Sequence, residues 1–71
     1  MKTIVIIINP NDVQKAKVHL DTLTNGRYIL PNLYKMEVED NELTSTINSI
    51  EYLLSDVDFC LTDEYYLYQY N

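Results

Sequence analysis

Carboxylates are the most numerous groups in this chain that could carry out chemistry. Asp56 and Asp58 flank a single residue, and Asp63 and Glu64 are adjacent. Paired carboxylates can act as an acid and a base when a pocket gives them different environments. They can also bind calcium, but a calcium-binding loop needs more acids at alternating positions and a glycine, which this segment lacks. The sequence therefore predicts no metal site and no cofactor.

His19 and Cys60 are the only histidine and the only cysteine. They could form a nucleophilic pair only if the fold brought them together. The single glycine, Gly26, is too little to build a phosphate-binding loop. We therefore expect no enzymatic activity and no catalytic residue.

One cysteine allows no internal disulfide, which fits a reducing compartment, and no segment has the length of a membrane span. We expect a cytoplasmic protein.

The charges are separated along the chain. Residues 1–36 hold all five basic residues and two acidic ones, whereas residues 37–71 hold nine acidic residues and no basic one. This asymmetry suggests a partner protein with a basic surface. The acids predicted to contact it form two groups: Glu37, Glu39, Asp40 and Glu42, followed by Asp56, Asp58, Asp63 and Glu64.

Tyrosines are concentrated at the end of the chain. Four of the seven lie within its last six residues: Tyr65, Tyr66, Tyr68 and Tyr70. Tyrosine supplies a large contact area with a polar tip, so these residues are predicted to contact the partner as well. Stacking on nucleic-acid bases is the other use of such a cluster. The net charge of −6 argues against it, because binding to phosphates needs a basic field.

Periodicity predicts the elements that must position these residues, in the order β-α-β-β-α-β. The predicted segments are a buried strand over 3–8, a helix between Asn11 and Gly26, strands over 27–30 and 33–39, a helix from Asp40 or Asn41, and a strand over 58–61. Asn11 is the expected N-cap of the first helix, and Gly26 is expected to end it in a left-handed conformation. Residues 62–71 could form a further edge strand or an ordered tail.

This order predicts one α+β domain over residues 1–71, of the ferredoxin-like kind, with two helices on one face of an antiparallel sheet. Apolar stripes at helical spacing begin at Val13 in the first helix and at Leu43 in the second. In such a sheet Ile4, Ile6 and Ile8 would face the helices. Val5 and Ile7 would face the open side, where the tyrosine tail, a second copy of the chain or a partner would cover them.

In size and charge alone, the chain resembles small acidic inhibitors that phages and mobile elements encode. The resemblance implies an inhibitor of the anti-CRISPR or anti-restriction class, which occupies a basic nucleic-acid-binding surface as a nucleic-acid mimic. Under this hypothesis the protein works in the host cytoplasm and contacts neither nucleic acid nor membrane. The alternative is a homodimeric structural or regulatory module, such as an antitoxin, in which acidity serves solubility alone.

Overall fold

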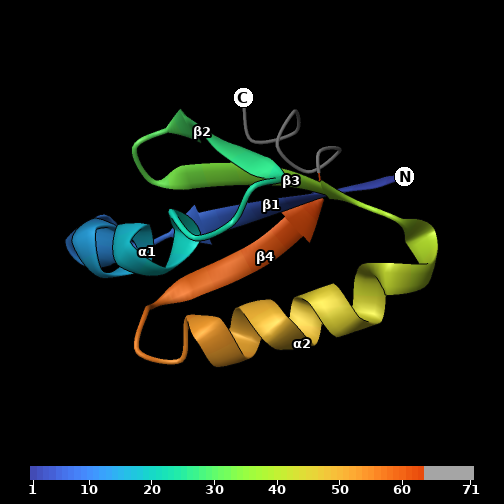
Figure 1. Ribbon diagram of the computed structural model, residues 1–71. Coiled ribbons are helices and arrows are strands. Elements are labelled where there is room, and N and C mark those ends of the chain that lie inside the picture. The colour runs from blue at the N-terminus through green and yellow to red at the C-terminus, as the bar shows by residue number, and fades with distance from the viewer. Residues whose placement is uncertain (64–71) are drawn as a thin grey trace.

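The computed structural model describes residues 1–63 and contains a four-stranded antiparallel sheet with two helices (Figure 1). The strands are β1 (Lys2–Ile8), β2 (Gly26–Leu30), β3 (Leu33–Val38) and β4 (Phe59–Asp63). The helices are α1 (Val13–Leu20) and α2 (Leu43–Leu53), preceded by the short 3-10 turns η1 (Pro10–Asp12) and η2 (Asp40–Glu42). The strand order is β2-β3-β1-β4. The predicted α+β class is confirmed.

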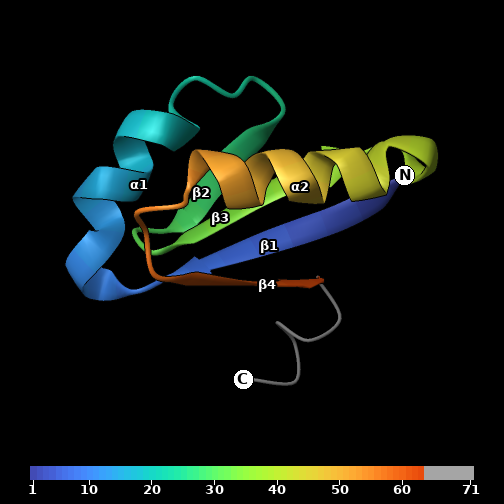
Figure 2. The same cartoon turned by 90° about the horizontal axis from the view of Figure 1, so that it is seen from below.

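β1 is a central strand because it pairs with β3 on one side and β4 on the other. Its alternate residues Ile4, Ile6 and Ile8 are at most 4% exposed and belong to the same cluster as apolar residues of both helices. Figure 2 shows α2 running along the sheet and α1 at the end of β1. On the opposite face Val5 is buried and Ile7 is half-buried. The predicted division of β1 between two faces is confirmed.

Both helices bury the stripes that their spacing predicts. Ala16 and Leu20 of α1 are buried, and so are Ile50 of α2 and Leu54, which follows it. Partly buried neighbours extend each stripe and pack against the same cluster: Val13 on α1, Leu23 after it, and Leu43 and Ile47 on α2. The two helices therefore share one core with the sheet.

The predicted ends of the first helix are wrong. Asn9 caps the turn η1, where its side chain accepts a hydrogen bond from the backbone N–H of Asn11 at 2.9 Å. The helix α1 begins only at Val13, and its N-cap position is Asp12, which forms no side-chain cap bond. The helix ends at Leu20, and Gly26 lies inside β2 without a positive φ. Pro10 explains the shift at the start, because proline fits the first turn of a helix and needs no hydrogen bond there.

The strand boundaries also differ from the prediction. β3 ends at Val38, so Glu39 follows the strand instead of alternating on it. β4 begins at Phe59 and extends to Asp63. It runs this far because Phe59–Asp63 pair residue by residue with Ile4–Ile8 of β1. The alternation of apolar and polar residues in β4 is shorter than its backbone pairing with β1. The sequence pattern alone therefore underestimates the length of β4.

Tyr28 of β2 and Tyr34 of β3 form an edge-to-face aromatic pair with ring centroids 5.1 Å apart. Burial raises the pKa of both hydroxyls above the ordinary value, and the negative charge of Asp21 raises each further. The hydroxyl oxygen of Tyr28 is buried without a hydrogen-bond partner among the described residues. An unpaired buried hydroxyl costs free energy because it has lost its hydration.

We expect the substitution Tyr28→Phe to raise the free energy of unfolding by up to about 1 kcal/mol, because it removes this unpaired hydroxyl and keeps the ring. Urea denaturation followed by circular dichroism measures the change. Tyr52→Phe is the matched control, since Tyr52 is 86% exposed and its hydroxyl can reach water. A clear loss of stability in Tyr28→Phe, with the control unchanged, would contradict the expectation.

Candidate protein-interaction surface

Four exposed carboxylates lie where β3 passes into α2, and we call them the acidic patch: Glu37, Glu39, Asp40 and Glu42. Glu37 lies on β3 between Met36 and Val38, both of which are buried, so its own side chain is on the other face of the strand. The chain then turns into η2, where the N–H of Glu42 donates to the carbonyl of Glu39 at 2.9 Å. Asp40 and Glu42 precede α2, where the helix dipole favours negative charge.

Only one carboxylate of the acidic patch is ion-paired among the described residues, although Lys35 lines the same hollow as Glu37. Asp40 lies 3.4 Å from the N-terminal amine of Met1. Within residues 1–63, the other three carboxylates form no ion pair. Exposed carboxylates with this little compensation create a negative potential that attracts a basic surface.

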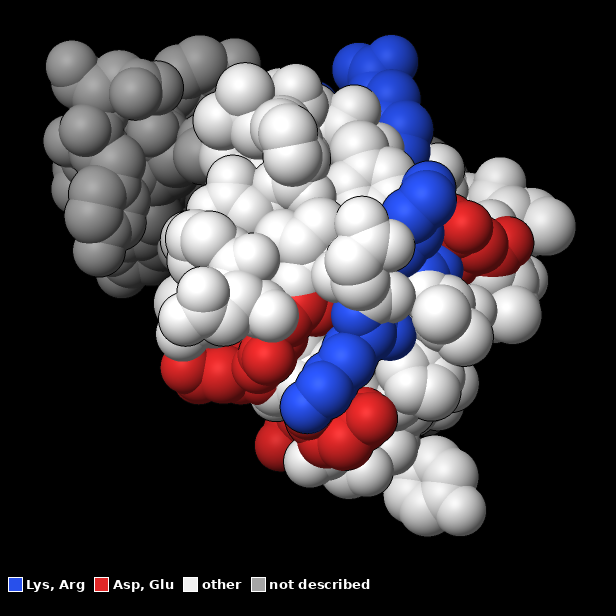
Figure 3. All heavy atoms as spheres, turned by 90° about the vertical axis from the view of Figure 1, so that its left-hand side faces the viewer, with Lys and Arg blue, Asp and Glu red and all other residues white. Residues whose placement is uncertain are grey.

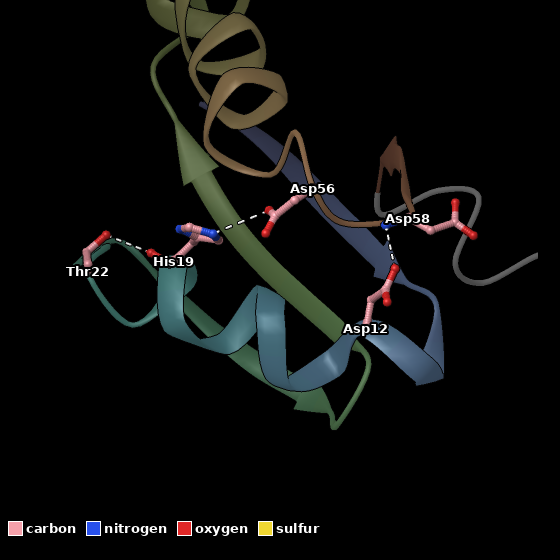
Figure 4. Close-up of polar contacts among 5 residues, drawn as sticks. All are labelled: Asp12, His19, Thr22, Asp56 and Asp58. Carbon is pink, nitrogen blue, oxygen red and sulfur yellow. Dashed lines mark hydrogen bonds and ion pairs between the residues drawn. The ribbon is translucent and has the colours of Figure 1, made fainter.

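Asp58 has a structural role at the start of β4 (Figure 4). Its backbone N–H donates to Oδ2 of Asp12 at 2.8 Å, and its own Oδ2 accepts from the side-chain amide of Asn9 at 2.9 Å. The N–H of Asn9 also donates to the carbonyl of Asp58 at 2.8 Å. These bonds join the end of β1 to the start of β4. Asp58 therefore has a structural role, whether or not it contacts a partner.

Asp56 lies beside a basic side chain that sequence reasoning missed. Its Oδ1 is 3.4 Å from Nε2 of His19, which projects from the last turn of α1 (Figure 4). When protonated, His19 compensates the charge of Asp56, whose position after α2 would otherwise be unfavourable. His19 and Asp56 lie far apart in the sequence, so their neighbours in the sequence do not reveal this contact.

The structure does not bring the two predicted acidic groups together. The acidic patch precedes α2 and Asp56 follows it, and an 11-residue helix is about 16 Å long. Figure 3 shows the side of the molecule that carries α1, where a band of Lys and Arg side chains has Asp and Glu side chains on both sides of it. That side has mixed charge. The acidic patch, where only Asp40 is ion-paired among the described residues, is therefore the better candidate for a negative contact surface.

The remaining predicted contact residues lie at or beyond the end of the described chain. Asp63 is the last residue of β4, and its backbone is paired opposite Ile4. The others lie outside the described residues: Glu64, Tyr65, Tyr66, Tyr68 and Tyr70. The part of the predicted surface that the structure describes is thus the acidic patch with Asp56 and Asp58.

His19 and Cys60 have separate surroundings. His19 contacts Asp56, whereas Cys60 is exposed on β4 and lies opposite Ile7 of β1, on the face away from the core. Among residues 1–63, no three side chains of His, Cys, Asp or Glu are grouped in a way that could hold a metal ion. In the same part of the chain, no helix has the length and apolar character needed to cross a membrane.

The chain matches no protein-family model, and the comparisons found no significant similarity to a curated protein or to a solved structure.

Proposed function

We propose that the protein binds a basic surface of another protein through its acidic patch and thereby keeps nucleic acid away from that surface. One observation carries the proposal: all four acidic side chains of the segment 37–42 are exposed where β3 passes into α2. Three of them form no ion pair within residues 1–63. Inhibition would be steric and electrostatic, without chemistry.

Carboxylates can take the place of phosphates on such a surface because both are anions that accept hydrogen bonds from arginine and lysine. Binding would release counterions from the basic groove, as nucleic acid does. The affinity should therefore fall steeply as the salt concentration rises. This dependence separates the proposed contact from an apolar interface, which higher salt does not weaken.

We also propose that the arrangement is of the ferredoxin-like kind. The strand order supports this, since α1 connects β1 and β2 with β3 between them, and α2 connects β3 and β4 with β1 between them. Two such split β-α-β units interleave in that fold. The acidic patch then occupies the crossover from β3 into the second helix. A small acidic inhibitor of the anti-CRISPR or anti-restriction class, working in the cytoplasm of a host cell, fits these features.

The double substitution Glu39→Gln and Glu42→Gln is expected to weaken partner binding about tenfold, or 1.4 kcal/mol, because it removes two exposed anions of the patch. The partner is first captured from nuclease-treated host lysate with the full chain and eluted in salt steps. Affinity is then measured by calorimetry with the purified partner. The proposal further requires that added DNA or RNA displace the chain from it.

The matched control is Asp21→Asn with Glu51→Gln, which also removes two exposed carboxylates but outside the acidic patch. This control should bind within about twofold of the unchanged chain. If both variants weakened partner binding equally, the effect would depend on net charge alone. That result would contradict a localised contact. Recovery of only the chain itself from the lysate would favour self-association, with acidity serving solubility.

A further inference from the structure

The outer edge of β2 is a second surface that could bind a protein. β2 stands at one end of the sheet, and within residues 1–63 it pairs only with β3. The N–H of Glu37 donates to the carbonyl of Asn25 at 3.4 Å, which marks these residues as a hydrogen-bonded pair. Such pairs alternate along antiparallel strands, so the backbone groups of Gly26 and Tyr28 point outward, away from β3. Unpaired edge groups are a template for another extended chain.

Apolar side chains are exposed along the same strand. Ile29 is 42% and Leu30 is 53% exposed, although most large apolar residues of β1 and β3 are buried. An added strand would cover part of this surface while it satisfied the outward backbone groups. The register shift between Tyr28 and Leu30 limits regular pairing to the first half of β2. The edge therefore fits a short extended segment rather than a long strand.

Positive charge lies on both faces beside this edge. The amine of Lys17 is 5.3 Å from the centre of the Tyr28 ring, on the helix side of the sheet. Arg27 is exposed and, one residue along the strand, lies on the opposite face. Asp21 offsets part of this charge, since it is ion-paired with Lys17 at 3.5 Å. Arg27 forms no ion pair within residues 1–63. It lines a hollow with Lys35 and Glu37, so the two cations there outnumber the one carboxylate.

We propose that the β2 edge binds an extended acidic segment of another protein by adding it as a strand. The outward backbone groups of Gly26 and Tyr28 pair with it, and Arg27 binds a carboxylate of the added strand. Its apolar side chains cover Ile29 and Leu30. A second copy of the chain fits this edge less well, because pairing two β2 strands would bring two Arg27 side chains close together. This contact is separate from the acidic patch and does not depend on the function proposed for it.

The test is an NMR titration of the full chain with a capped heptapeptide of alternating glutamate and valine. We expect shifts of the amide resonances over Gly26–Leu30 and slower hydrogen exchange at Gly26 and Tyr28. Arg27→Glu should lower the affinity for the peptide about tenfold, which corresponds to 1.4 kcal/mol. Lys2→Glu is the matched control, since it changes the net charge equally from an exposed position on β1.

Four results would overturn the proposal. A lysine–valine peptide could bind as tightly as the glutamate–valine peptide, or Lys2→Glu could weaken binding as much as Arg27→Glu. Sedimentation could also reveal a dimer whose formation alone shifts the β2 amides, in which case a second copy occupies the edge. Binding of the acidic peptide with unchanged β2 resonances would likewise place the contact elsewhere.

Discussion

Replacing Gly26 by alanine is expected to lower the free energy of unfolding by about 2–3 kcal/mol. A Cβ atom built at this position would overlap the ring of Tyr34, which crosses the backbone of β2 there. Tyr34 is only 2% exposed and packs edge-to-face on Tyr28, so its ring has little room to move. Intrinsic propensity alone predicts the opposite sign, since alanine is usually more stable than glycine within a strand. Urea denaturation of the purified variant measures the change.

The neighbouring substitution Arg27→Ala controls for a general effect on β2, and its cost should stay within about 0.5 kcal/mol because the side chain is exposed. A second comparison introduces Gly26→Ala into a chain that already carries Tyr34→Leu. The smaller side chain leaves room for the added methyl group, so the cost of Gly26→Ala should fall by more than about 1 kcal/mol. An equal cost in both backgrounds would show that the ring of Tyr34 is not the reason for the glycine.

Gly26 also illustrates why the ends of the elements could not be predicted from the sequence. A glycine after a helical stripe usually marks a left-handed helix end, and the pair Asn25-Gly26 has that form. The reason for this glycine is instead the ring of Tyr34, which contacts it across the β2–β3 hairpin. Alternation and helical spacing depend on neighbours in the sequence, so they predicted the strands, the helices and their buried faces. The contact that requires a glycine is a tertiary one.

The candidate site shows the same division between local and tertiary information. The acids at 37–42 were predicted as one group, and the structure keeps them together because the segment is short and its side chains are exposed. Asp56 and Asp58 were predicted as a further part of the contact. The fold places Asp56 beside His19 and joins Asp58 to Asn9 and Asp12. Counting charges along the sequence does not predict these contacts.

The charge asymmetry of the sequence is thus reduced at one end of the molecule and retained at the other. Near α1, basic and acidic side chains lie next to one another, and surface pairs of this kind contribute little stability. At the start of α2 the carboxylates stay together with little compensation among the described residues. Since a local excess of one sign steers binding more than the total charge does, the acidic patch is where a basic partner would first be attracted.

Leu54→Ala is expected to lower the free energy of unfolding by about 2–5 kcal/mol, since it leaves a cavity under the end of α2. Leu54 is fully buried, and it belongs to the cluster that joins β1 to both helices. A chain of 71 residues has a total stability of about 4–10 kcal/mol, so this variant should be close to unfolding at room temperature. Thermal unfolding followed by circular dichroism measures the loss.

Leu30→Ala is the control of identical chemistry, because the side chain of Leu30 is 53% exposed. It should cost less than about 1 kcal/mol, since partial burial contributes less and no enclosed cavity forms. Leu54 also precedes the loop that carries Asp56 and Asp58, and the N–H of Val57 donates to its carbonyl at 3.0 Å. In NMR spectra of Leu54→Ala below its melting temperature, the amides of this loop should therefore shift more than those of the acidic patch. Equal costs for the two alanine variants would mean that the core described for residues 1–63 does not carry the stability of the fold.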